Sequence, residues 1–229
     1  MKIELKGIVV IVGNYGSGKT EVSINLALQR KGDGLDVKIA DLDLVNPYFR
    51  TREAKDILSE SGIDVILPPE NYLHSDLPIL SPAVQGMLQK PSQFTLFDVG
   101  GNDVGATVLA ALEKPFEGKT IQVLQVVNPF RPYTETITGC LKVKSEIEGA
   151  SKLQITGFIC NANLIDETSA ADIYEGYRFA KALSEESSLK LEFITVSNEL
   201  MKKVDVKKFD CPVLEIYRQL VFPWNRKKV

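Results

Sequence analysis

One short stretch near the start of the chain has the residue types and spacing of a phosphate-binding loop. It fits the pattern G-x-x-x-x-G-K-[ST] at every position, with Gly13, Asn14, Tyr15, Gly16, Ser17, Gly18, Lys19 and Thr20. In such a loop the backbone N–H groups point at a phosphate, and glycines let the main chain approach it closely. Lys19 would reach the β- and γ-phosphates, and the Thr20 hydroxyl would hold Mg²⁺. We therefore expect this phosphate loop and the adjoining Glu21 to bind a nucleotide.

Aspartates that follow later apolar runs have the chemistry to bind a metal and to orient water. Asp41 and Asp43 alternate with one residue between them, so on an extended chain their carboxylates point to the same side. They could order magnesium-bound waters or an attacking water. Asp98 ends another apolar run, and the N–H of Gly100 behind it would meet a γ-phosphate. The expected catalytic residues are Lys19, Asp43 and Asp98, and the expected metal-binding residues are Thr20, Asp41, Asp43 and Asp98. The alternative is that the aspartates are only turn residues at strand ends.

Asparagines follow the next apolar runs of the chain. An amide side chain presents a donor and an acceptor together, which suits the edge of a purine. Asn161 stands directly at the end of a predicted strand, so we expect it to read the base. Asn128, Asn163 and Asn198 are further candidate contacts. The alternative is that all of them only form loops.

The elements that must position these residues alternate along the whole chain. Apolar runs predict strands at about 5–12, 36–41, 63–67, 93–98, 120–127, 153–160 and 191–196. The segments between them predict helices at about 18–31, 50–61, 79–90, 104–113, 133–149, 169–187 and 212–220. We predict an α/β fold, with one domain over residues 1–229 and a doubly wound, mostly parallel seven-stranded sheet that carries helices on both faces. Ligands of such sheets bind at the carboxyl ends of the strands.

Composition excludes several other classes of protein. At 229 residues with 44% hydrophobic and 25% charged residues, the chain is typical of a globular protein. A net charge of −3 gives no strong signal for nucleic-acid binding. Three cysteines without a C-x-x-C pair, and a single histidine, disfavour a zinc site and fit a cytoplasmic protein. No signal peptide and no membrane span are expected. Pro223 interrupts the apolar and basic stretch near the end, so we do not expect membrane contact.

Taken together and in this order, the motifs resemble the MinD/ParA/nitrogenase-iron-protein branch of P-loop NTPases, within the SIMIBI class. Dethiobiotin synthetase and the metallochaperone GTPases belong to the same branch. The likeness rests on the phosphate loop, Asp41-Leu42-Asp43 and Asp98-Val99-Gly100-Gly101, and Val127-Asn128-Pro129 and Gly157–Asn161 extend it. The resemblance implies a P-loop fold that uses ATP and Mg²⁺. It also implies that Asp43 serves the attacking water, Asp98 is the acid of the second switch loop, and Asn161 pairs with adenine.

The sequence departs from that branch at the residues that set dimerisation and base choice. Dimeric members carry K-G-G-x-G-K-[ST], whose first Lys reaches the partner's phosphates. Here that position is Asn14, followed by Tyr15, which puts the usual ATP-bound dimer in doubt. The GTP-reading pattern N-K-x-D is also missing, because Asn161-Ala162-Asn163-Leu164 lacks its Lys and its Asp. This absence favours ATP over GTP.

The sequence thus predicts a slow, Mg²⁺-dependent ATPase that acts as a nucleotide switch. Loops at 41–52 and 98–103 would change shape with the γ-phosphate, and a partner protein or a second copy of the chain would respond to that change. Other interpretations stay open. They are an ATP-dependent small-molecule enzyme resembling dethiobiotin synthetase, a GTPase metallochaperone, and a module that binds nucleotide without hydrolysing it.

Overall fold

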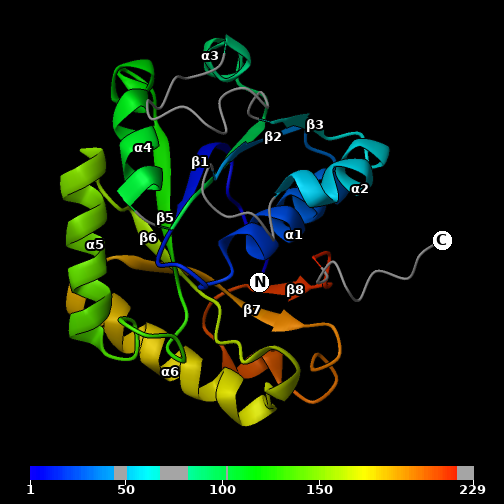
Figure 1. The fold of residues 1–229 in the computed structure, drawn as a ribbon. Coiled ribbons are helices and arrows are strands. Elements are labelled where there is room, and N and C mark those ends of the chain that lie inside the picture. Colours follow the sequence, from blue (N-terminus) through cyan, green and yellow to red (C-terminus); the bar gives the residue numbers. More distant parts are fainter. Residues whose placement is uncertain (44–50, 68–81, 102, 221–229) are drawn as a thin grey trace.

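A single parallel sheet forms the centre of the computed structural model, which describes residues 1–43, 51–67, 82–101 and 103–220 (Figure 1). The sheet has eight strands in the order β3-β2-β4-β1-β5-β6-β7-β8. The strands are β1 (Gly7–Val12), β2 (Val37–Leu42), β3 (Asp64–Ile66), β4 (Phe94–Val99), β5 (Ile121–Val127), β6 (Gly157–Cys160), β7 (Lys190–Ser197) and β8 (Val213–Ile216). The predicted α/β fold with a doubly wound sheet is confirmed, but the expected seven strands are one too few.

Helices cover both faces of this sheet (Figure 1). One face carries α1 (Lys19–Gly32) and α2 (Lys55–Glu60). The other carries α3 (Pro82–Gln89), α4 (Asp103–Phe116), α5 (Ile137–Ser151) and α6 (Ala170–Ser187). Short 3₁₀ turns lie at Thr51–Ala54, Ile165–Glu167 and Val206–Lys208. None of the described helices is long and apolar enough to cross a membrane.

Strand β1 shows why the central strands are apolar throughout. Val9 and Ile11 point into the core on the α1 side, whereas Ile8 and Val10 point into the core on the α4 side. Successive side chains of a strand alternate between the two faces, and here helices bury both faces. The continuous apolar runs in the sequence therefore correspond to strands rather than to buried helices.

The order of the strands places the functional candidates at one edge of the sheet. From β1 the chain crosses to β2, and β4 then fills the place between them, while β5 extends the sheet on the other side of β1. The winding direction thus reverses beside β1, and such reversals open a crevice at the carboxyl edge. The phosphate loop leaves β1 at this edge. Asp41 on β2 and Asp98 on β4 are register partners there.

The predicted helix at 212–220 is wrong. Val213–Ile216 forms strand β8, which pairs in parallel with β7, and Tyr217–Leu220 continues without regular structure. Pro212 and the alternation of half-buried and buried residues in β8 suit an edge strand. A run this short fits both the helical period of 3.6 residues and the strand period of 2. Its strand conformation follows from pairing with the neighbouring β7.

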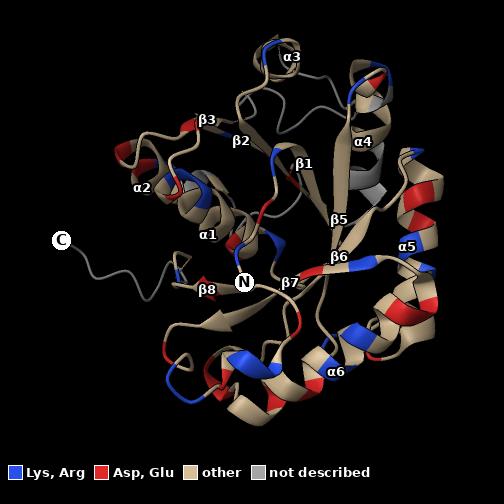
Figure 2. Ribbon diagram, turned by 180° about the vertical axis from the view of Figure 1, so that it is seen from behind, with Lys and Arg blue, Asp and Glu red and all other residues tan. Residues whose placement is uncertain are grey.

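Charge is spread evenly over the helices α5 and α6 (Figure 2). Lys144 pairs with Glu148 at 2.8 Å within α5, and Lys181 of α6 pairs with Asp210. Ser169 caps the start of α6 through a capping box with Asp172. Charged side chains of both signs therefore alternate on the outer surface of these two helices.

Two helical glycines give a matched test of the packing between α6 and the sheet. A Cβ on Gly176 of α6 would lie 2.2 Å from the Cβ of Ala162, whereas a Cβ on Gly149 of α5 would meet no atom within 4 Å. We expect Gly176→Ala to destabilise the protein by about 1–3 kcal/mol through overpacking. Gly149→Ala should stabilise it by about 0.5–1 kcal/mol through helix propensity. Urea unfolding followed by circular dichroism measures both, and equal stabilisation by the two variants would contradict the packing.

Candidate functional site

The phosphate loop adopts a backbone conformation that only glycine accepts easily. Gly13, Gly16 and Gly18 have φ values of 144°, 74° and 87°. A Cβ on Gly18 would lie 2.2 Å from Asn161 Nδ2, and one on Gly13 would lie 2.5 Å from the carbonyl oxygen of Val126. The loop is therefore held closely between β5 and the loop that follows β6.

Lys19 begins helix α1 and turns its side chain back over the loop. Its Nζ donates a hydrogen bond to the carbonyl oxygen of Asn14 at 3.0 Å, and the side chain is buried. Burial lowers the pKa of Lys19, and the charges of Asp98 and Asp43 act in the opposite direction. A cation held in this way gains from a nearby anion that can satisfy its remaining N–H groups.

Asp98 is completely buried at the end of β4, where hydroxyl groups surround its carboxylate. It accepts hydrogen bonds from Thr51 at 2.9 Å, from Ser23 at 3.3 Å and from Thr20. Burial nevertheless raises the pKa of Asp98 to about 6, against the hydrogen bond from Thr51 and the charge of Lys19. Oxygen ligands and a carboxylate close to Thr20 form a donor set that suits Mg²⁺.

The other two aspartates lie beside this centre. Asp41 Oδ1 accepts the backbone N–H of Asp43 at 3.0 Å, and both side chains are buried. A Cβ on Gly100 would lie 2.9 Å from Asp43 Oδ1. A Cβ on Gly101 would lie 2.5 Å from Lys19 Nζ and 2.8 Å from the backbone nitrogen of Tyr15. The two glycines therefore fit between Asp43 and the phosphate loop because they lack side chains. Residues 44–50 and 102 of the two expected switch loops lie outside the described residues.

Asn161 joins three parts of the site. Its Nδ2 donates to the carbonyl oxygen of Ser17 at 2.7 Å, and its Oδ1 accepts from the Thr195 hydroxyl at 2.6 Å. The side chain is buried between the phosphate loop and β7. One amide hydrogen and one oxygen lone pair are left over for a ligand.

The remaining asparagines differ in what they hold. Asn128 is buried, and its side chain donates to the carbonyl oxygen of Asn163 at 2.8 Å and accepts from the backbone N–H of Phe130 at 3.0 Å. Asn163 Oδ1 accepts the backbone N–H of Ile165. Asn198 is exposed, and its backbone N–H donates to the carbonyl oxygen of Ile216. The loops after β5 and β6 are thus tied to each other.

A cavity of about 380 Å³ opens beside the phosphate loop. The expected residues that line it are Tyr15, Gly16, Gly18, Lys19, Thr20, Glu21, Asn128, Asn161, Asn163 and Asn198. Gly13, Asn14, Ser17, Gly100 and the three aspartates are not among its lining residues. The cavity therefore extends from the loop toward β6 and β7. The aspartates lie behind Lys19 and Thr20.

Sequence reasoning missed several side chains in the cavity wall. They include Arg131, Asp166, Thr168, Ser197, Glu199 and Arg218. Arg131 follows Asn128-Pro129 directly after β5. Its position near a predicted strand end could have marked it as a candidate site residue. Arg218 could not have been placed in this way, since its segment was predicted as a helix. In the structure Arg218 pairs with Asp166 at 2.9 Å.

Glu21 and Asn25 of α1 hold the segment that follows β8. The carboxylate of Glu21 accepts the backbone N–H groups of Gln219 at 2.6 Å and Leu220 at 3.1 Å. The amide of Asn25 accepts the N–H of Tyr217 and donates to its carbonyl oxygen. Burial raises the pKa of Glu21, and these backbone donors oppose the change. Glu21 lines the cavity, but its carboxylate binds the backbone of the segment after β8.

Comparisons with solved structures agree with this architecture. The cell division protein FtsY of Thermotoga maritima is 18% identical, with a TM-score of 0.58, over 86% of this chain and 65% of its own. The signal recognition particle 54 kDa protein of Aeropyrum pernix, in complex with GDP, is 18% identical, with a TM-score of 0.54, over 82% of this chain and 40% of its own. A nucleotide-binding protein of Archaeoglobus fulgidus, in complex with ADP, is 15% identical, with a TM-score of 0.53, over 86% of this chain and 84% of its own.

These identities are low, so the likeness establishes the fold and not a shared activity. The chain spans less than two thirds of the length of FtsY and of the 54 kDa protein. No protein-family model and no curated protein sequence matches it. The chain therefore shares its parallel α/β fold with these proteins.

The raised pKa of Asp98 predicts how stability depends on pH. The folded protein holds the proton of Asp98 more tightly than the unfolded chain, whose carboxyl has the ordinary pKa of 3.8 against about 6 in the fold. The stability that this proton contributes is present at low pH and is lost as pH rises through the folded pKa. The stability of Asp98→Asn relative to wild type should therefore grow by about 2 kcal/mol between pH 4 and pH 7.5. Urea unfolding without nucleotide measures this change, and a difference that does not vary with pH would contradict it.

Proposed function

We propose that this protein binds a nucleoside triphosphate with Mg²⁺, hydrolyses it slowly and acts as a nucleotide switch. The observation that carries the proposal is the preformed phosphate loop, which opens onto a cavity of about 380 Å³ with Lys19 and Thr20 in its wall. This arrangement presents backbone N–H groups, a buried cation and the start of a helix to one anion. The SIMIBI-class fold supports the same interpretation.

Phosphate and metal binding would fall to the residues at the start of α1 and the end of β4. Lys19 would exchange its hydrogen bond to Asn14 for the β- and γ-phosphates. The hydroxyl of Thr20 and the carboxylate of Asp98 would hold Mg²⁺, directly or through water. Mg²⁺ binds typically through one or two protein oxygens together with substrate phosphates, so this donor set is sufficient. Asp41 completes the acidic surroundings of the metal.

Water orientation and the switch itself would use the neighbouring loops. Asp43 lies against Gly100, next to the point where a γ-phosphate would reach Lys19. Gly101 packs so closely on Lys19 that a Cβ on Gly101 would collide with Lys19 Nζ. A phosphate that binds between the two residues must therefore push the loop at Gly101 away from Lys19. A triphosphate would therefore shift the second loop more than a diphosphate does. Such a difference is what a partner protein can recognise.

ATP is the preferred nucleotide in this proposal. A guanine reader needs a carboxylate that accepts from the N1–H and N2 groups of the base. Asp166 lies in the cavity wall, but its carboxylate already forms an ion pair with Arg218. Asn161, with its remaining hydrogen and lone pair, would meet the adenine edge, and Asn128, Asn163 and Asn198 would shape the loops around it. Of the neighbours named above, one is in complex with GDP and another with ADP, so a direct comparison of ATP and GTP is part of the test.

The order of the motifs favours the MinD/ParA-like branch and a readout by a partner protein or a second copy of the chain. The amide of Asn14 is occupied by the carbonyl oxygen of Pro132, so it would not act across a dimer in the manner of the missing lysine. A cytosolic location fits the three buried, free cysteines. The small-molecule enzyme and the GTPase metallochaperone are the alternatives to this proposal, and no contact in the described site favours either.

Lys19→Ala tests the nucleotide site. We expect it to weaken Mg·ATP binding at least about 100-fold, because it removes a charged hydrogen-bond donor to the phosphates. Lys119→Ala is the matched control, since this exposed lysine precedes β5 at the opposite edge of the sheet. Isothermal titration with Mg·ATP and Mg·GTP provides the measurement. Unchanged affinity for both nucleotides in Lys19→Ala would overturn the site.

Asp43→Asn separates hydrolysis from binding. The substitution keeps the shape of the side chain but removes the charge that would orient the attacking water. We expect phosphate release under saturating nucleotide to fall by about 100-fold or more, with the affinity for Mg·ATP within a few-fold of wild type. If wild type and variant released phosphate equally slowly, the protein would be a binding module without hydrolysis.

A further inference from the structure

The loop between β5 and α5, residues 128–136, is unusually well fixed for an exposed connection. The Thr134 hydroxyl donates to the carbonyl oxygens of Asn128 at 2.7 Å and of Arg131 at 3.1 Å. Tyr133 has a φ of 71°, which a non-glycine residue adopts rarely. A Cβ on Gly139 would lie 2.4 Å from the carbonyl oxygen of Tyr133. Uncommon backbone conformations of this kind persist where the surroundings enforce them, often beside functional sites.

This loop is attached to both neighbouring loops of the cavity. Asn14 of the phosphate loop donates its Nδ2 hydrogen to the carbonyl oxygen of Pro132 at 2.8 Å. Asn128 holds the loop after β6 through the carbonyl oxygen of Asn163. Arg131 lies between these two attachments, directly before Pro132. The backbone at Arg131 is therefore held close to the phosphate loop.

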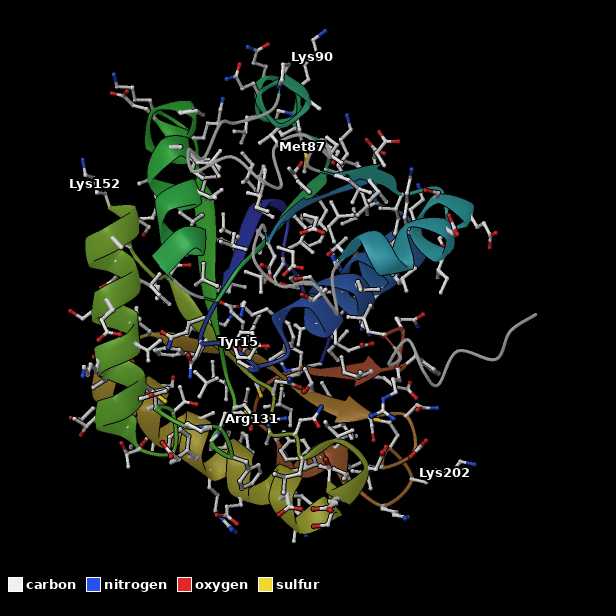
Figure 3. All side chains as sticks on the ribbon, viewed as in Figure 1. Tyr15, Met87, Lys90, Arg131, Lys152 and Lys202 are labelled. Carbon is white, nitrogen blue, oxygen red and sulfur yellow. The ribbon has the colours of Figure 1, made fainter. Side chains whose placement is uncertain are left out.

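Arg131 lines the cavity together with Tyr15 and Gly16, and Figure 3 shows Tyr15 and Arg131 at the same end of the sheet. Its Nε is closed off from solvent and has no hydrogen-bond partner among the described residues. The other cations of the cavity wall each have acidic neighbours, because Lys19 faces Asp98 and Asp43, and Arg218 pairs with Asp166. Within the described ranges, Arg131 forms no ion pair with an acidic side chain.

We propose that Arg131 binds the phosphates of the nucleotide held by the phosphate loop of the same chain, and that Asn14 positions it for this role. The inference rests on the proposed nucleotide site and deepens it. Arg131 lines the cavity without an acidic partner among the described residues, so an anion in the cavity would stabilise its charge, and phosphate oxygens match the planar geometry of a guanidinium. The phosphates carry the charge of a nucleotide, whereas the base and the ribose are neutral. Arg131 therefore distinguishes nucleotides by their phosphates and not by their base.

The test compares Arg131→Gln and Arg131→Lys with Arg178→Gln, a control on the exposed face of α6 outside the cavity. Titrations use Mg·ATP and adenosine, with Mg·GTP and guanosine in parallel. We expect Arg131→Gln to weaken triphosphate binding about 10- to 100-fold and to leave nucleoside binding unchanged. Arg131→Lys should recover part of the loss, because it restores the charge without the fork. Arg178→Gln should bind as wild type does, and circular dichroism checks that each variant is folded.

The role of Asn14 has its own readout. If Asn14 acts through Arg131, Asn14→Ala should weaken triphosphate binding in wild type. It should have little further effect in Arg131→Gln, because residues that act as one unit are not additive. Losses that add fully would overturn the positioning role.

The remaining outcomes separate the two proposals. If wild type binds no triphosphate, the proposed function fails and the inference fails with it. If wild type binds and Arg131→Gln binds equally well, the assignment of Arg131 is wrong while the nucleotide site stands. An equal loss for the triphosphate and its nucleoside would place Arg131 at the base and would also overturn the inference.

Discussion

The buried charges of Lys19 and Asp98 are the constraint on which the rest of this structure depends. Both side chains lie out of solvent at the carboxyl edge of the central strands, with Thr20, Ser23 and Thr51 as hydroxyl neighbours of the carboxylate. Removing charges from water costs several kcal/mol for each ion, so two buried charges of this kind add little to stability by themselves. It is the kind of arrangement that active sites retain, because an arriving metal or anion uses groups already in place.

Amide side chains organise the loops around these charges. Asn161 ties the phosphate loop to β7, Asn128 ties the loop after β5 to the loop after β6, and Asn14 ties the phosphate loop to the loop after β5. Asn25 does the same for the segment after β8. Each amide satisfies backbone groups that would otherwise be left without partners at the ends of strands. A site held in this way loses little freedom when a ligand binds, which favours affinity.

The sequence alone was sufficient to predict those features that one short segment determines by itself. The phosphate loop, the strand at Phe94–Val99 and the placement of Asp98 at its end follow from glycine spacing and apolar runs. The meeting of Asp41 and Asp98 follows from the rule that parallel strands end at one edge. The strand at Val213–Ile216 could not be predicted, since β7 supplies its partners. Arg218 likewise enters the cavity only through a contact made far along the chain, because Glu21 holds the segment after β8, whereas Arg131 follows a predicted strand end and could have been found from the sequence.

Hydrogen exchange of the purified chain, followed by mass spectrometry with and without Mg·ATP and Mg·GTP, shows whether the phosphate loop binds a triphosphate beside Lys19. If it does, at least one of the two triphosphates should slow amide exchange in peptides covering residues 13–20 and 98–101, and adenosine or guanosine alone should not. Unchanged exchange in both peptides at millimolar concentrations of either triphosphate would rule out this nucleotide site.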